Sequence, residues 1–278
     1  MKTILVPIDF SADSINALEH AIKFANAVKA NIRMVHVQKS KNFKVPKYFI
    51  DFERMYSNNV DDYFKVILEK YKPKIMLGFD YVVRNGKVYR EIVEQAIKDD
   101  AYLIIIGTHG ISGFEEFWIG SNSYRVVSNA ECPVVTIRNG YLRKTIKKIV
   151  LPIDMTIESR QKTNLTVEIA KFFNSEIHVV SVKETNTPAV VEKIERYVVQ
   201  TTEYIKKKGI KCVNDSLLGS NITESTIEYA ISVDAELISI MTEQVSSTKN
   251  LWLGKYAQQM VNHSPIPVLS NHPKRKNL

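Results

Sequence analysis

The sequence predicts two tandem α/β domains, each a doubly wound fold with a five-stranded parallel sheet and helices on both faces. The chain has 278 residues, more than one hydrophobic core usually spans, and each half of about 140 residues has the size of a typical domain. Strand-like and helix-like periodicities alternate along the chain, as in parallel sheets with covered faces. The chain also repeats itself, which indicates two related halves.

The repeat fixes the domain boundaries. The opening Lys2-Thr-Ile-Leu-Val-Pro-Ile-Asp9 recurs as Lys147-Lys-Ile-Val-Leu-Pro-Ile-Asp154, and the ending Cys132-Pro-Val-Val recurs as Ile266-Pro-Val-Leu. Between these landmarks, Asp100-Ala-Tyr-Leu-Ile-Ile-Ile106 recurs as Asp234-Ala-Glu-Leu-Ile-Ser-Ile240. We therefore expect one domain over residues 1–138 and a second over residues 146–272, joined by a linker at 139–144.

The first βα unit is the easiest to justify. Residues 4–6 form a short apolar run, and the serines and aspartate of residues 11–14 are helix-capping types. After them, apolar residues fall on one helical face: Ile15, Leu18, Ile22 and Ala25.

The rest of the first half continues the alternation. Residues 58–71 are expected to form a helix, because Val60, Phe64, Ile67 and Leu68 share one face. Apolar runs with β-branched residues predict the strands, and the segments between them read as helices. In chain order the remaining elements are a strand at 32–37, a weak strand at 81–83, a helix at 88–98, a strand at 103–106, a helix at 120–129 and a strand at 134–137.

Composition narrows the class of protein. Hydrophobic residues make up 45% of the chain, and no apolar run approaches the roughly 20 residues of a membrane span. Pro7 and Asp9 interrupt the apolar N-terminus too early for a signal peptide, so we expect a cytoplasmic protein. Cys132 and Cys212 are the two cysteines, one in each half at unrelated positions, which gives neither a disulfide framework nor a metal cluster.

The net charge of +8 raises the question of nucleic acid. The basic residues are dispersed, however, and their densest stretches are 39–47, 206–208 and 274–276, without zinc-finger or basic-zipper spacing. A solvated face and a basic tail explain them better than a nucleic-acid surface.

The most informative motif is Gly107-Thr-His-Gly110, followed after nine residues by Gly120-Ser121. It lies between an apolar strand and a predicted helix. Glycines let the backbone approach an anion closely, and a helix N-terminus offers unpaired N–H groups, so the motif predicts a phosphate site. The alternative is that the glycines only form a turn while Ser121 only caps the helix.

The second half keeps the apolar pattern but not these residues. Met241, Gln244 and Lys255 stand where Gly107, Gly110 and Ser121 stood, and Gly254 remains at the position of Gly120. The side chains of Met241 and Gln244 would fill the space of a phosphate, and a position with positive φ would disfavour them. Lys255 can still attract an anion, so we expect a weakened site there.

Asp9, Val37, Gly86 and Gly107 all lie at or just beyond predicted strand ends. In parallel sheets these ends share one rim, where ligands bind. Asp9 can hydrogen-bond a ligand or hold a cation beside phosphates, but it can also cap the first helix. Because Asp154 repeats Asp9 in the half that lacks the glycines, part of its role is expected to be structural.

With these residues in place, the chain resembles two fused copies of the universal stress protein domain, whose nucleotide-binding signature is Gly, two residues, Gly, nine residues, then Gly with Ser or Thr. Residues 107–121 fit it in full. Further matches are the stretch from Val6 to Ser11, His36-Val37, and Asn129-Ala-Glu-Cys-Pro-Val-Val135. The resemblance implies a Rossmann-like fold of the adenine nucleotide alpha hydrolase type, with ATP, accompanied by Mg²⁺, as the ligand.

The resemblance also implies which residues hold the nucleotide. Asp9 and the backbone near Val37 would hold adenosine, the glycines and Ser121 would hold ribose and phosphates, and Ser123 would assist from the first helical turn. The full set of expected contacts is Pro7, Ile8, Asp9, Val37, Gly86, Gly107, His109, Gly110, Gly120, Ser121, Asn122 and Ser123. Gly86 rests on the resemblance of residues 83–86 to the loop after the third strand.

The family further implies that domains pair through their last strands. Residues 134–137 would then lie antiparallel to Val268 and Leu269 within one chain, a built-in dimer that leaves homodimerisation open but not required.

The sequence predicts no efficient enzyme. His109 has no neighbouring nucleophile motif, and no Walker lysine follows the glycines, so slow ATP hydrolysis is the most we expect. The leading hypothesis is a stress-response sensor or regulator that binds ATP in residues 1–138. The alternative is an interaction scaffold of the same fold that binds no nucleotide. A phosphoacceptor receiver domain is disfavoured, because Asp9 lacks the acidic neighbour that would hold a metal.

Overall fold

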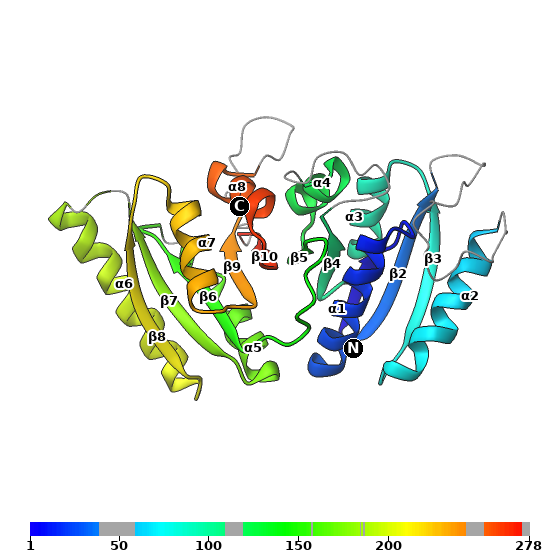
Figure 1. Ribbon diagram of the computed structural model, residues 1–278, viewed down its shortest axis with the longest axis horizontal. Helices are drawn as coiled ribbons and strands as arrows, with labels where there is room; N and C mark the ends of the chain where they lie inside the picture. The colour runs from blue at the N-terminus through cyan, green and yellow to red at the C-terminus, as the bar shows by residue number, and fades with distance from the viewer. Residues whose placement is uncertain are drawn as a thin grey trace. The chain divides into compact units, whose positions relative to one another are not determined.

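The structure is a computed structural model that describes residues 1–38, 59–108, 119–156, 158–183, 185, 187–242 and 253–273. The chain divides into two compact units, Met1–Lys144 and Thr145–Leu278. Each unit is a parallel sheet with helices against its faces (Figure 1), so the predicted fold class is confirmed. No helix in the described ranges is both long enough and apolar enough to serve as a membrane span.

The first unit alternates strands and helices in the predicted order. Its sheet runs β3-β2-β1-β4-β5, with every neighbouring pair parallel. The elements are β1 (Thr3–Pro7), α1 (Ala12–Val28), β2 (Asn31–Gln38), α2 (Val60–Tyr71), the 3₁₀ turn η2 (Lys72–Lys74), β3 (Phe79–Asn85), α3 (Val88–Lys98), β4 (Leu103–Gly107), α4 (Ser121–Asn129) and β5 (Val134–Ile137).

The second unit repeats this topology, with the parallel pairs β8-β7, β7-β6, β6-β9 and β9-β10. The elements are β6 (Lys148–Ile153), the 3₁₀ turn η3 (Glu158–Arg160), α5 (Thr163–Phe173), β7 (Glu176–Lys183), α6 (Pro188–Lys207), β8 (Cys212–Leu218), α7 (Ile222–Ser232), β9 (Leu237–Met241), α8 (Lys255–His263) and β10 (Val268–Asn271).

The observed boundaries differ from the predicted ones mainly at the edge strand. β3 extends over seven residues, where the sequence predicted three, because its whole length pairs with β2. An edge strand buries fewer side chains, so its apolar pattern is weaker than its hydrogen bonding. Helix α2 begins at Val60, with Asn59 as its N-cap, and the predicted start at Asn58 lies outside the described residues.

The central strands form the core of each unit. Residues 4–6 of β1 and 103–105 of β4 are fully buried, as are residues 149–151 of β6. Parallel strands covered on both faces are expected to be continuous apolar runs, as these are. The chain leaves β1 toward β2 on one side and returns to β4 on the other, so the strand order reverses between β1 and β4.

The two units also repeat their turns. Lys29 after α1 and Asn174 after α5 both adopt left-handed φ values, of 55° and 52°. Asp100 before β4 and Asp234 before β9 do so too, with φ of 44° and 61°. Left-handed φ is uncommon for residues other than glycine, so its recurrence at equivalent positions marks these turns as part of the shared scaffold.

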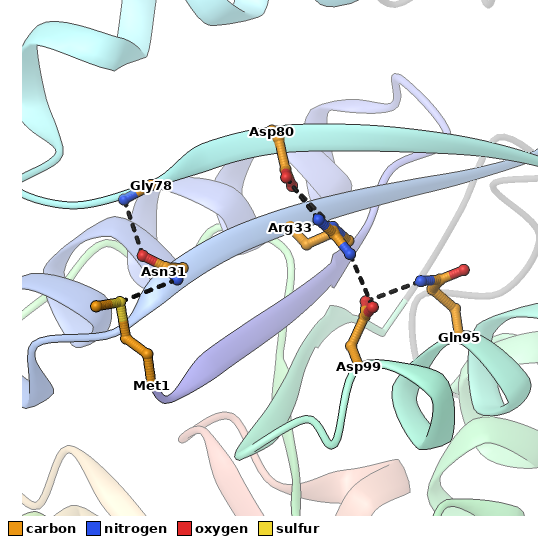
Figure 2. A network of polar contacts seen from close by, with 7 residues as sticks. All are labelled: Met1, Asn31, Arg33, Gly78, Asp80, Gln95 and Asp99. Atoms are coloured by element: carbon orange, nitrogen blue, oxygen red, sulfur yellow. Dashed lines mark hydrogen bonds and ion pairs between the residues drawn. The ribbon is translucent and has the colours of Figure 1, made fainter.

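A polar network fastens β3 and α3 to the amino-terminal part of β2 (Figure 2). The Arg33 guanidinium donates to both carboxylate oxygens of Asp80, at 2.9 and 2.6 Å, and to Asp99 Oδ1 at 2.7 Å. Gln95 donates to the other Asp99 oxygen at 2.8 Å. Asp80 and Asp99 raise the pKa of Arg33 further above its usual range, so the cation persists at all accessible pH values.

The segment predicted to be a linker lies along α1. The Tyr141 carbonyl accepts hydrogen bonds from His20 Nε2 at 3.0 Å and Asn16 Nδ2 at 3.2 Å. The Lys144 ammonium pairs with the Glu19 carboxylate, which also accepts from the Tyr71 hydroxyl. Residues 139–144 therefore belong to the packed surface of the first unit.

We expect Arg33→Leu to destabilise the first unit. The substitution removes the cation that pairs with the Asp99 carboxylate, and the Asp99 side chain is only 8% exposed. The free energy of unfolding should therefore fall by about 2 kcal/mol. As a control, Lys65→Leu removes the exposed pair with Asp62 and should cost less than about 0.5 kcal/mol. Urea unfolding followed by circular dichroism measures both. Equal losses in the two variants would contradict the structural role of the network.

Stability should fall as the pH drops below about 6.5. Burial lowers the pKa of His20, His36 and His178, so the unfolded chain binds protons before the folded chain does. The free energy of unfolding therefore decreases as the pH falls from the unfolded pKa through the folded values. His20→Gln keeps a donor for the Tyr141 carbonyl and should flatten this slope. Urea unfolding between pH 7 and 5 measures the slope of the free energy of unfolding against pH. The same slope in His20→Gln as in the wild-type protein would contradict the role of His20.

Candidate functional site

The carboxyl ends of β1, β2 and β4 form the edge at which the candidate residues gather. Pro7 ends β1, Ile8 and Asp9 follow it, Val37 is the penultimate residue of β2, and Gly107 ends β4. The Ile8 amide donates to the Val35 carbonyl at 2.8 Å, which extends the contact of β1 with β2 beyond the strand. The edge includes the β1/β4 reversal, the usual ligand position in such sheets.

Asp9 holds the turn that begins α1. Its Oδ1 accepts from the Ser11 amide at 3.0 Å and from the Ser11 hydroxyl at 2.5 Å. Ser11 is in turn the N-cap, and its Oγ accepts from the Ser14 amide at 3.2 Å. Asp9 therefore does not cap the helix itself, because Ser11 does, but its carboxylate holds Ser11 in place and is half-buried.

Phe10, the residue after Asp9 in this turn, packs in a ring cluster with His36 and Phe64. Phe10 has a left-handed φ of 65° and its ring lies 4.8 Å from that of His36 and 5.1 Å from that of Phe64. The His36 Nδ1 forms a hydrogen bond of 2.7 Å with the Ile8 carbonyl, and burial lowers the pKa of His36. The neutral ring therefore donates at Nδ1 and links the end of β2 to the end of β1.

Gly107 is packed against helix α1. A Cβ added at this position would lie 3.0 Å from the Asp13 carbonyl oxygen and 3.1 Å from its carbonyl carbon, both of them backbone atoms. Its φ is not positive, because the positive-φ glycines of the described residues are Gly86, Gly140 and Gly209. The expectation that a side chain here would suffer from positive φ is therefore wrong. The glycine is needed because a helix backbone passes directly over it.

Helix α4 begins without a side-chain cap. Gly120 is the N-cap, with φ −57° and ψ 143°, and its amide donates to the Thr108 carbonyl at 2.6 Å. A helix that starts this way leaves its first amides, those of Ser121 to Ser123, to partners outside the helix. Ser121 is exposed and Asn122 is half-buried at this end.

Ser123 has a defined structural partner. Its hydroxyl donates to the Gly107 carbonyl at 2.8 Å, and the side chain is buried. The bond ties the first turn of α4 to the end of β4 and so sets the distance between the two glycine-bearing segments. The bond gives Ser123 a positioning role, and its predicted contact with a ligand stays a prediction.

Gly86 lies on the same edge but at the outer strand. Its φ is 150°, and its amide donates to the Gln38 carbonyl at 3.3 Å. Two strands, β2 and β1, lie between β3 and β4, so Gly86 is three strand spacings from β4, roughly 14 Å. Gly219 follows β8 in the second unit and donates to the Lys183 carbonyl at 3.2 Å in the same way. The repeat thus retains a glycine with this backbone hydrogen bond, although only Gly86 has a positive φ, and the predicted nucleotide contact of Gly86 stays a prediction.

The central part of the glycine motif lies outside the described residues. His109 and Gly110 belong to the segment 109–118, and Gln244 belongs to the corresponding segment of the second unit. Their predicted roles stay predictions.

The second unit keeps the turn but changes the helix that follows. Asp154 Oδ1 accepts from the Thr156 amide at 2.7 Å and from its hydroxyl at 2.5 Å, as Asp9 does from Ser11. Met241 stands at the position of Gly107 and is buried. In the first unit the equivalent space beside the strand end holds the Asp13 backbone of α1. In the second unit the first turn is the separate 3₁₀ segment η3, and α5 begins only at Thr163.

Lys162 lies between η3 and the start of α5 and hydrogen-bonds back to η3. Its Nζ donates to the Ser159 carbonyl at 2.6 Å, and the side chain is only 3% exposed. Burial lowers the pKa of Lys162 to about 8, opposed by the charge of Asp154. The sequence signal for this group is a lysine at the position where the first half has Ala17, and the predicted site residues do not include it.

Tyr256 adds a second bulky group at the same end of this unit. It replaces Asn122 in the first turn of α8, and burial raises the pKa of its hydroxyl above the ordinary value. Tyr256 and Lys162 are both within electrostatic reach of Asp154. Near Asp154 the second unit therefore has two bulky side chains, Lys162 and Tyr256, where the first unit has Ala17 and Asn122.

The described residues contain no group of three or more histidine, cysteine, aspartate or glutamate side chains able to hold a metal ion. Mg²⁺ at such an edge would therefore be held chiefly by the phosphates of a ligand and by water, with Asp9 as the nearby carboxylate. Mg²⁺ is commonly bound in this manner, through one or two carboxylates and substrate oxygens.

Comparisons with known proteins agree with this architecture. The universal stress protein YxiE of Bacillus subtilis is 32% identical over 147 residues, which cover 49% of this chain and 97% of YxiE. The crystal structure of a universal stress protein from Archaeoglobus fulgidus matches 98% of both chains with a TM-score of 0.71 and 17% identity, a likeness of fold alone. A universal stress protein solved in complex with cAMP covers 47% of this chain and 99% of its own, with 18% identity and a TM-score of 0.39.

The family assignment covers both units. The model of the universal stress protein family matches residues 1–138 and again residues 145–270. The two matches coincide with the two parallel sheets and with the internal repeat. This chain belongs to the universal stress protein family and carries two copies of its domain.

Proposed function

We propose that residues 1–138 bind an adenine nucleotide, ATP accompanied by Mg²⁺, and that the bound nucleotide regulates a cytoplasmic stress response. In the second unit Met241 stands in place of Gly107, so the observation that carries the proposal is the end of β4 without a side chain together with the adjacent start of α4. Its N-cap is a glycine without a side chain, directly beside the end of β4, and its first amides are left to outside partners. The positive end of the helix dipole adds to the attraction of phosphate at this position.

The residues divide into two groups in this proposal. Asp9 and the backbone of Pro7, Ile8 and Val37 would hold the adenosine. The phosphates would lie against Gly107, His109, Gly110, Gly120, Ser121 and Asn122, with Ser123 fixing the geometry. Gly86 would shape the turn at the outer strand. The second unit would serve as a structural partner, because Met241, Lys162 and Tyr256 line the corresponding edge.

Calorimetric titration of ATP and Mg²⁺ into the nucleotide-stripped protein tests the proposal. We expect about one site per chain, and loss of binding in Gly120→Val, because the branched side chain would block the approach of phosphate. The backbone of Gly120 has φ −57°, which valine adopts without strain, so the variant should fold.

The matched control is Gly254→Val, which makes the same change at the same position of the second unit. Its φ is −57° as well, and we expect it to leave nucleotide binding unchanged. Two sites per chain, or loss of binding in Gly254→Val, would overturn the assignment to the first unit.

The second candidate function is an interaction scaffold that binds no nucleotide. It is favoured by the fact that several signature residues have structural partners in the chain itself. Asp9 accepts a hydrogen bond from Ser11, and Ser123 donates one to the Gly107 carbonyl. Gly107 also lies where a side chain would collide with the Asp13 backbone. Absence of nucleotide from the gently purified protein, with no thermal shift on addition of ATP, would support this function.

Gly107→Ala distinguishes packing from ligand approach. The added Cβ would lie 3.0 Å from a backbone oxygen, so we expect a loss of about 1–3 kcal/mol in the free energy of unfolding even without nucleotide. Thermal and urea unfolding of the nucleotide-free variant measure this loss. Wild-type stability together with weakened ATP binding would instead assign the glycine to the ligand.

A further inference from the structure

Three cationic side chains gather around Tyr89 at the N-terminus of α3. The Lys87 ammonium lies 5.1 Å from the centre of the Tyr89 ring, and the Arg125 guanidinium, from α4, lies 5.4 Å from it. Arg90 Nε donates to the Tyr89 hydroxyl at 3.3 Å, and this bond lowers the pKa of Tyr89. We call Lys87, Tyr89, Arg90 and Arg125 the Tyr89 cluster.

The cluster joins two helices that start at the same edge of the sheet. Helices α3 and α4 pack against each other, and both follow strands of the same parallel sheet, so their N-termini point the same way. The N-cap of α3 is Lys87, and neither it nor Gly120 provides a side-chain cap. Both positive helix ends therefore lie beside the three cations, which strengthens the attraction of an anion.

The neighbouring carboxylates of α3 are directed to another cation. Arg84 at the end of β3 pairs with Glu91 at 2.9 Å and with Glu94 at 3.7 Å. Glu94 also acts on Arg90 from one turn away, at an exposed position. Lys87, Arg90 and Arg125 are exposed and Tyr89 is half-buried, so solvent reaches the charged groups.

The second unit provides an internal comparison. Where the first unit has Lys87, Tyr89, Arg90 and Arg125, the second has Asn221, Thr223, Glu224 and Gln259. The pair Thr223 and Gln259 retains the contact between the two helices, with a hydrogen bond of 3.1 Å. Asn221 caps α7 by accepting from the Glu224 amide. The unit without the glycine signature has thus lost all three cations and gained both a cap and a carboxylate.

We propose that the Tyr89 cluster is an anion subsite that takes the terminal phosphates of the nucleotide and makes the first unit selective for nucleotides with a longer phosphate chain. The inference rests on the proposed function and extends it to the ligand. The loss of the cations together with the glycines, while the helix contact is kept, connects the cluster with phosphate binding rather than with folding.

The reach of the side chains agrees with this role. Arg125 is one helical turn after Ser121, about 5.4 Å along the axis, and helical side chains lean toward the N-terminus. In agreement, the Arg125 guanidinium lies 5.4 Å from the ring of Tyr89, which is in the first turn of α3. Tyr89 orders Arg125 and Lys87 through its ring, which reduces the conformational entropy that they lose when an anion binds.

The test compares ATP, ADP and AMP, each with Mg²⁺, by calorimetry in the full chain. The variant Lys87→Gln, Arg90→Gln, Arg125→Gln should bind ATP about tenfold more weakly, because each exposed charge contact contributes a few-fold at most. Its affinity for AMP should change less than about threefold. The control Lys65→Gln, Lys70→Gln, Lys98→Gln removes the same charge from α2 and from the other end of α3, and should leave the ratio of ATP to AMP affinity unchanged.

An equal loss for ATP and AMP, or the same loss in the control, would overturn the inference while leaving nucleotide binding in place. Failure of the wild-type protein to bind any nucleotide would remove the proposed function instead. Tripolyphosphate then decides the inference by itself. Binding that weakens about tenfold in the triple variant alone would support an anion site, and absence of tripolyphosphate binding by the wild-type protein would overturn it.

Discussion

The close packing of helix α1 over the end of β4 is the contact on which the candidate site depends. It allows the helix to begin three residues after Asp9, so that Ser11 caps it and the carboxylate remains at the edge of the sheet. It requires a residue without a side chain at position 107, because the Asp13 backbone occupies the space of a Cβ. The Gly107 carbonyl then receives the Ser123 hydroxyl, which sets the start of α4.

The second unit differs from the first at the contact between the first helix and the end of the fourth strand. With Met241 at the equivalent position, the first turn becomes a separate 3₁₀ segment and the helix restarts at Thr163. The interruption leaves the Ser159 carbonyl to the buried Lys162 ammonium. A single change from glycine to a large residue is thus accompanied by a new helix start and by a buried cation beside Asp154, on a sheet whose topology is otherwise the same.

Comparison of the two units separates scaffold from site. The Asp9 turn, the left-handed residues after the first helix and before the fourth strand, and the glycine after the third strand all recur. The uncapped start of α4 recurs too, as α8 at Gly254. What does not recur is Gly107, the serines of α4 and the cations around Tyr89. These differences, rather than the shared features, distinguish the two edges chemically.

The sequence by itself determined the fold class, the repeat and the positions of most helices and strands, because hydrophobic periodicity and capping are local properties of the chain. The same periodicity also placed Asp9, Val37 and Gly107 at predicted strand ends, which a parallel sheet must bring to one edge. The physical role of Gly107 was decided only by the tertiary structure, since the atom that excludes a Cβ belongs to Asp13, 94 positions away in the chain by the residue numbers. Lys162 and the Tyr89 cluster depended on it as well, because burial and the contact between α3 and α4 arise only when separate elements pack together.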